Sequence, residues 1–144
     1  MVDDYFDVTL HYSRRRVCLR ASSLIASPRP RFAIHTTRGS FVKHGLDPQE
    51  AQLKGRIDPR SPEFGVDPQD GTLTRPDGTS ECVPTKRGNY LAFYEAVAAA
   101  ILDDGPVPVS PEDARAGLTL IDLARRASAE ERRLPVPGAS SPAG

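Results

Sequence analysis

The three histidines, His11, His35 and His44, are the residues of this chain best suited to bind a metal ion. A zinc site takes three or four ligands at characteristic spacings, such as His-x-His or His-Glu-x-x-His. The histidines stand in neither spacing, and we can name no third or fourth ligand to complete a site. We therefore expect no metal site in this chain.

Two polar clusters could bind an oxygen-rich ligand. The basic run at residues 14–16 could hold a phosphate, although three basic residues in a turn are usually solvated. Asp47, Gln49 and Glu50 could hydrogen-bond a polyol, but the same residues suit the positive end of a helix. We favour the structural interpretation for both clusters.

Charge and cysteine content narrow the class of protein. Lysine plus arginine and aspartate plus glutamate both total 19, and the pI is near 6.8, so no strong field attracts nucleic acid or a membrane surface. Cys18 and Cys82 form no Cys-x-x-Cys pair, which favours a reducing compartment. The longest apolar run, residues 96–102, is too short to cross a membrane. We expect a cytoplasmic protein that binds neither nucleic acid nor membrane.

Alternating apolar residues predict four strands before any helix. Residues 4–12 have the two-residue period of a half-buried strand, and residues 17–25 repeat it after a polar turn, so the two form a hairpin. Residues 31–37 and 40–43 predict a second antiparallel pair. The strands that must position any site therefore come first in the chain.

A long excursion follows, from Gly45 to Gly71, with no sustained period except a short amphipathic turn over residues 47–54. Ordered loops of this length are uncommon and often functional. Two further short strands are predicted on either side of the Pro-Asp-Gly turn at residues 76–78.

Beyond this hairpin the period changes to that of a helix. Asn89 is a suitable N-cap for a helix over about residues 90–103, and Ser110 for a second helix that ends near residue 127. Residues 134–136 could add an edge strand, and residues 137–144 form a small-residue tail that we expect to be flexible.

Strands first and helices last predict an α+β fold, a mostly antiparallel sheet with helices packed on one face. The other face of the sheet is then open. Because a broad apolar sheet face is a common self-complementary surface, we expect a homodimer through it.

Three segments resemble a known family: IHTTRGSFVKHGLDPQEAQLK at residues 34–54, TKRGNYLAFYEAVAAAI at 85–101 and PVPVSPEDARAGLTLIDLARRAS at 106–128. Together they resemble the C-terminal domain of Gfo/Idh/MocA-family oxidoreductases, especially a bacterial branch of NADP-linked sugar or polyol dehydrogenases. The resemblance covers about residues 3–136.

The resemblance implies a Rossmann domain followed by an α+β domain whose sheet forms one wall of the substrate site and the oligomer interface. This chain has neither a Gly-x-Gly-x-x-Gly turn for a dinucleotide nor a counterpart of the family's catalytic lysine. We expect residues 3–136 to be the substrate-covering and oligomerisation domain of an NAD(P)-dependent sugar or polyol oxidoreductase, inactive in isolation. NAD or NADP would bind the Rossmann half, and this fragment alone would bind none. A stand-alone binding or oligomerisation module derived from the family is the alternative.

The family's other catalytic signature is Asp-x-x-x-His on a helix, and Asp7 and His11 match it literally. The alternation around them predicts a strand, on which the two side chains would be roughly 13 Å apart, too far for a direct hydrogen bond. We interpret them as ordinary strand residues and expect no catalytic residue in this chain.

Three residues are candidates for binding substrate. The resemblance places Tyr90, at the start of a helix, near the pocket between the two domains; packing against the sheet is the alternative. Lys43 and His44 begin the family-specific loop, where a cation could meet a substrate hydroxyl or a cofactor phosphate. For these two residues the alternative is a solvated strand end.

Overall fold

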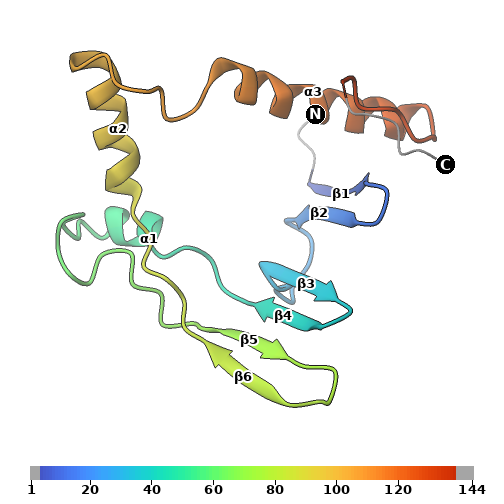
Figure 1. Ribbon diagram of the computed structural model, residues 1–144, viewed down its shortest axis with the longest axis horizontal. Helices are drawn as coiled ribbons and strands as arrows, with labels where there is room; N and C mark the ends of the chain where they lie inside the picture. Colours follow the sequence, from blue (N-terminus) through green and yellow to red (C-terminus); the bar gives the residue numbers. More distant parts are fainter. Residues whose placement is uncertain (1–3, 139–144) are drawn as a thin grey trace. The chain divides into compact units, whose positions relative to one another are not determined.

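The computed structural model describes residues 4–138, which fall into two compact units. One unit contains the described parts of residues 1–26 and 109–144, and the other contains residues 27–108. The described residues contain six strands and three helices, and every strand pair is antiparallel (Figure 1). The α+β class is therefore confirmed, although the strands form two sheets, of two and four strands.

The first unit begins with a hairpin of β1 (Tyr5–His11) and β2 (Arg16–Ser22). Val8 faces Leu19 and Leu10 faces Val17, so the apolar residues share one side of the ribbon. On the other side Arg20 Nε lies 2.7 Å from Asp7 Oδ2. The two-residue period thus predicted both the hairpin and its apolar face correctly.

The same unit contains α3 (Pro111–Ala129), whose first turn carries the expected capping residues. The hydroxyl oxygen of Ser110 accepts a hydrogen bond from the Asp113 amide at 3.1 Å. The partly covered apolar positions of its second half are Leu120, Leu123, Ala124 and Ala127. Leu118 and Ile121 are 68% and 54% exposed, so the helix presents apolar surface that its own unit does not cover.

The edge strand predicted at residues 134–136 is wrong, because these residues are irregular. Pro135 and Pro137 have no backbone N–H to donate, which removes the ladder hydrogen bonds that a strand needs. Most of the tail predicted to be flexible, residues 139–144, lies outside the described residues.

The second unit is built on a four-stranded meander in the order β3 (Phe32–Thr36), β4 (Gly39–Lys43), β5 (Gly71–Thr74) and β6 (Ser80–Val83) (Figure 1). Ile34, Phe41 and Leu73 lie opposite one another across three strands. They give one face of the sheet an apolar centre.

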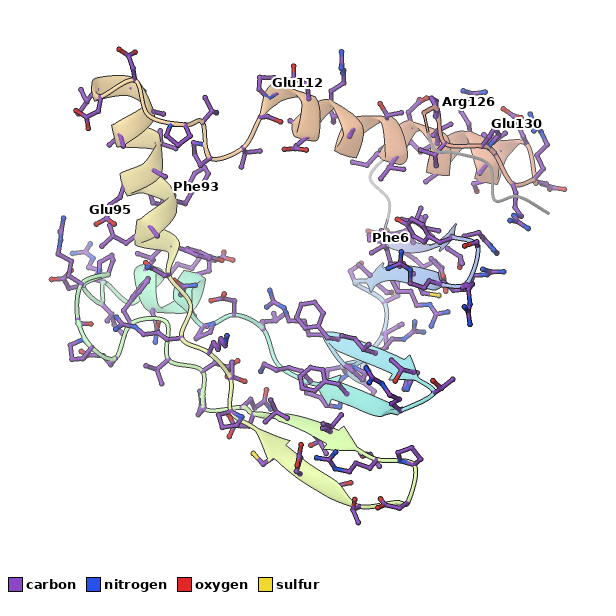
Figure 2. The ribbon with its side chains drawn as sticks, in the orientation of Figure 1. Phe6, Phe93, Glu95, Glu112, Arg126 and Glu130 are labelled. Carbon is purple, nitrogen blue, oxygen red and sulfur yellow. The ribbon has the colours of Figure 1, made fainter. Side chains whose placement is uncertain are left out.

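Two helices complete this unit. The short α1 (Gln49–Lys54) lies in the excursion between β4 and β5, and α2 (Tyr90–Leu102) follows β6. The side chain of Asn89 accepts a hydrogen bond from the Ala92 amide at 3.1 Å, as the sequence predicted for a cap. Phe93 and Glu95 extend from opposite sides of α2, and no residue of this helix is buried (Figure 2).

The excursion is held around Phe64, the one buried apolar side chain among residues 4–138. Arg87 donates from Nε to the Phe64 carbonyl at 2.6 Å and from Nη2 to the Ser61 carbonyl at 2.7 Å. Gln52 Oε1 accepts from the Gly65 amide at 2.7 Å. Side chains thus replace the missing strand ladder and satisfy the backbone groups of this loop.

Candidate functional site

A hollow of about 160 Å³ lies in the second unit, where the excursion meets the start of β3, the end of β4 and the segment before α2. Its lining is polar and charged around two apolar rings, those of Phe32 and Pro48. The charged residues that line it are Arg31, Lys43, Asp47, Asp67 and Lys86. Lys43, one of the predicted site residues, is part of this lining.

Lys43, the last residue of β4, is a wall of the hollow and is only 9% exposed. Its ammonium donates to Asp67 Oδ2 at 2.8 Å, to the Gln69 carbonyl at 2.6 Å and to the His44 carbonyl at 3.1 Å. An ammonium has three protons, so all its donors are engaged. Lys43 therefore anchors residues 67–69 to the strand end.

Asp67 is held from two sides. One oxygen accepts from Lys43, and the other accepts from the Gln69 amide at 2.9 Å. Both side chains of the ion pair are 11% exposed. The hydrogen bond from Lys43, followed by that from the Gln69 amide, lowers the pKa of Asp67, so the group is a stable carboxylate at neutral pH.

Gln49 connects the excursion to the start of α2 and is 1% exposed. Its Oε1 accepts from the Tyr90 amide at 2.7 Å, and its Nε2 donates to Asp47 Oδ1 at 3.0 Å. Asp47 Oδ1 also accepts from the Gln49 amide at 2.9 Å. These contacts are structural, but Asp47 does not cap α1 as the sequence suggested, because the N-cap is Pro48 and no side chain caps the helix.

The hollow thus receives only one of the three candidate residues. Tyr90, the first residue of α2, is 41% exposed and is not part of the lining. His44 is exposed and is also outside the lining, although its carbonyl accepts from Lys43. Tyr90 is nevertheless linked to the hollow, because Gln49 joins its backbone to Asp47.

Comparison with known proteins places the chain in a family. A family model described as the oxidoreductase family, C-terminal alpha/beta domain, matches residues 1–137. The chain belongs to the Gfo/Idh/MocA oxidoreductase family. Family members pair a Rossmann domain with this C-terminal domain.

Individual relatives agree with this assignment. The uncharacterised oxidoreductase YdgJ of Escherichia coli K12 is 42% identical over 123 residues, which cover 83% of this chain and 36% of YdgJ. IolW of Bacillus subtilis, a scyllo-inositol 2-dehydrogenase (NADP(+)), is 32% identical over 136 residues, or 91% of this chain and 38% of IolW. The chain therefore spans well under half the length of these relatives.

The fold of the whole chain also matches solved structures. A Klebsiella pneumoniae protein assigned as an oxidoreductase superposes with a TM-score of 0.89 at 25% identity, covering 97% of this chain and 40% of that protein. The similarity therefore extends over residues of both units.

The literal match to the family's Asp-x-x-x-His signature lies on a strand. Asp7 and His11 are both in β1, where Asp7 is paired with Arg20.

Among residues 4–138 no group of three histidine, cysteine or acidic side chains is arranged to hold a metal ion. No helix of that range has the length and apolarity to span a membrane.

Three site residues of this family member escaped the sequence analysis: Arg31, Asp67 and Lys86. Asp67 and Lys86 lie in the loops before β5 and before α2. Arg31, which the sequence placed at the start of a strand, lies just before β3. The length of the excursion suggested an ordered functional loop, but this signal concerns Asp67 alone, because Arg31 and Lys86 lie outside residues 45–71.

Proposed function

We propose that this chain is the substrate-covering and oligomerisation domain of an NAD(P)-dependent oxidoreductase that acts on a sugar or polyol. The dinucleotide would bind a Rossmann domain of the same protein, and hydride transfer would be organised there. The observation that carries the proposal is the match of residues 1–137 to the family's C-terminal domain. The name of IolW supports both an inositol-like substrate and NADP.

Within this role we propose that Tyr90 and His44 face the substrate, and that Lys43 positions the loop beside them. Tyr90 and His44 are exposed, and their polar groups are available to a polyol hydroxyl. Lys43 has its protons engaged and would act through the loop that it holds. The hydrogen bond that the Tyr90 amide donates to the Gln49 side chain gives the aromatic residue a fixed starting position.

The proposal predicts that this chain alone neither binds nor oxidises NADPH. We expect no change in NADPH fluorescence up to about 100 μM chain, because a pyrophosphate needs a glycine-rich turn at a helix N-terminus. The protein with its Rossmann domain should bind NADPH and oxidise it to NADP+ while it reduces a keto-inositol or keto sugar. Micromolar binding of NADPH by the isolated chain would place the cofactor site here and contradict the proposal.

We further propose a homodimer through the apolar face of the four-stranded sheet. Phe32 and Ile34 are 52% and 54% exposed on this face, and Phe41 lies opposite Ile34. Because successive residues of a strand point to opposite faces, Ala33 lies on the other side.

Substitution Ile34→Asp should therefore halve the mass measured by light scattering at tens of micromolar. An unpaired carboxylate in an apolar interface is strongly unfavourable. Ala33→Asp adds the same charge to the same strand on the opposite face and should leave the dimer intact. A monomeric parent protein, or equal effects of the two substitutions, would show that this face is not the interface.

A further inference from the structure

Two cations of the hollow have no bonded counter-ion. Among residues 4–138, neither Arg31 nor Lys86 makes a side-chain hydrogen bond or ion pair. The Arg31 guanidinium lies 5.6 Å from the centre of the Phe32 ring, which fixes it at the edge of the hollow. Lys43, by contrast, is neutralised by Asp67. The hollow therefore presents two cationic groups without a bonded partner, beside the Lys43–Asp67 ion pair and the Asp47 carboxylate. The positive charge of Arg31 also contributes to lowering the pKa of Asp67.

This arrangement fits an oxyanion. Like charges that share a small concave surface repel each other, and a bound anion relieves that repulsion. A guanidinium offers two parallel N–H groups to a carboxylate or phosphate, and an ammonium adds a point charge. Arg31 and Lys86 come from the segments before β3 and before α2, so they could hold one anionic group between them.

The remaining walls fit the carbon skeleton of a hydroxylated ligand. The Asp47 carboxylate can accept hydrogen bonds from hydroxyl groups, while Phe32 and Pro48 offer apolar surface to C–H groups. A volume of about 160 Å³ is below that of pockets for drug-sized ligands. The hollow therefore suits one charged group and a few attached carbons.

We propose that the hollow binds the negatively charged end of a small polyhydroxylated acid, with Arg31 and Lys86 as its binding residues. The oxyanion is the carboxylate of a sugar acid or the phosphate of a sugar phosphate. The hydroxylated part of this ligand rests on the proposed function, whereas the recognition of charge rests on the hollow alone.

Titration of the ¹⁵N-labelled protein tests this inference without any cofactor. D-Gluconate and D-glucose 6-phosphate are the two anionic probes, and sorbitol is the neutral one. We expect at least one anion to shift the amide signals of Gly65, Lys86 and Gly88 in a saturable way at millimolar concentration or below. Sorbitol should bind at least ten times more weakly, and the preferred anion distinguishes carboxylate from phosphate.

Substitutions Arg31→Gln and Lys86→Gln should each weaken binding of the preferred anion by at least tenfold. Arg38→Gln is the matched control, because Arg38 lies in the turn at the other end of β3 and carries the same charge. Lys86 holds no other group in place, so its removal should leave the spectrum of the free protein unchanged apart from its neighbours.

Three results would overturn the inference: no saturable shift with either anion, equal binding of sorbitol, or equal losses for Arg38→Gln and Lys86→Gln. None of them depends on NADPH. An active oxidoreductase whose hollow binds no anion would therefore refute this inference and leave the proposed function standing. Anion binding by a protein that transfers no hydride would support this inference and contradict the proposed function.

Discussion

Substitution Gly65→Ala is expected to lower the free energy of unfolding by about 3 kcal/mol or more. Gly65 has a φ of +77°, a region that costs any residue with a Cβ atom. A Cβ atom at this position would also overlap the carbonyl oxygen of Gly88. That oxygen belongs to backbone that cannot move freely, because the Gly88 amide donates to the Gly65 carbonyl at 2.8 Å. Urea unfolding followed by circular dichroism would measure the loss.

Substitution Gly78→Ala separates the cost of the backbone conformation from the cost of the steric overlap. Gly78 has a similar φ of +86°, but a Cβ atom there would meet nothing within 4 Å. This variant should lose only about 1 kcal/mol, which is the cost of the backbone conformation. Equal losses at both positions would mean that the Gly65–Gly88 approach relaxes easily and does not hold the wall of the hollow.

Local sequence patterns predicted the strands and helices because side-chain orientation repeats at a fixed period along each of them. The alternation around Val8 places β1 correctly, and the caps Asn89 and Ser110 mark the starts of α2 and α3. Each signal depends on a residue's own side chain and near neighbours in the chain. The edge strand near residue 135 failed because its prolines outweigh its apolar character.

The hollow could not be predicted in the same way. It depends on contacts between residues far apart in sequence, such as Lys43 with Asp67 and Gln49 with Tyr90. These contacts produce no periodic pattern of residue types in the sequence, because each side chain satisfies one backbone or charged group in a loop. The sequence did single out Lys43, but its position at a strand end could not reveal that three acceptors engage it.

The same argument applies to the faces of the sheet. Alternation along β3 predicts that Phe32 and Ile34 share a side, and the register confirms that Phe41 joins them. What covers that side is a property of the assembly, and a second copy of this chain is the occupant that we propose for it. Single-chain periodicity shows which residues share a side but carries no signal for the surface that meets them.

Substitution Asp67→Asn is expected to cost about 3 kcal/mol of unfolding free energy at pH 7, because it leaves the Lys43 ammonium nearly buried without a counter-ion. Asparagine keeps the shape of the side chain and can still accept from the Gln69 amide. The loss therefore measures the charge and not the loop geometry. Thermal or urea unfolding of the two proteins gives the difference.

Glu50→Gln is the control. Lys54 Nζ lies 2.7 Å from Glu50 Oε1, nearly the same distance as in the Lys43–Asp67 pair, but these side chains are 75% and 72% exposed. Water screens the exposed pair, so we expect no measurable loss. If both substitutions were neutral, burial of the Lys43–Asp67 pair would not matter to the fold.

The pH dependence of the free energy of unfolding is a second test of the role of the Asp67 charge. The pKa of Asp67 lies below its ordinary value of 3.8, so the unfolded chain takes up a proton before the folded one does. The stabilisation is therefore complete above about pH 4 and disappears as the pH falls through the lower, folded pKa. The difference between the parent protein and Asp67→Asn should shrink over that acidic range. A difference that remained after Asp67 had become protonated in both the folded and the unfolded state would assign the loss to shape and not to charge, since protonated aspartic acid and asparagine are both neutral.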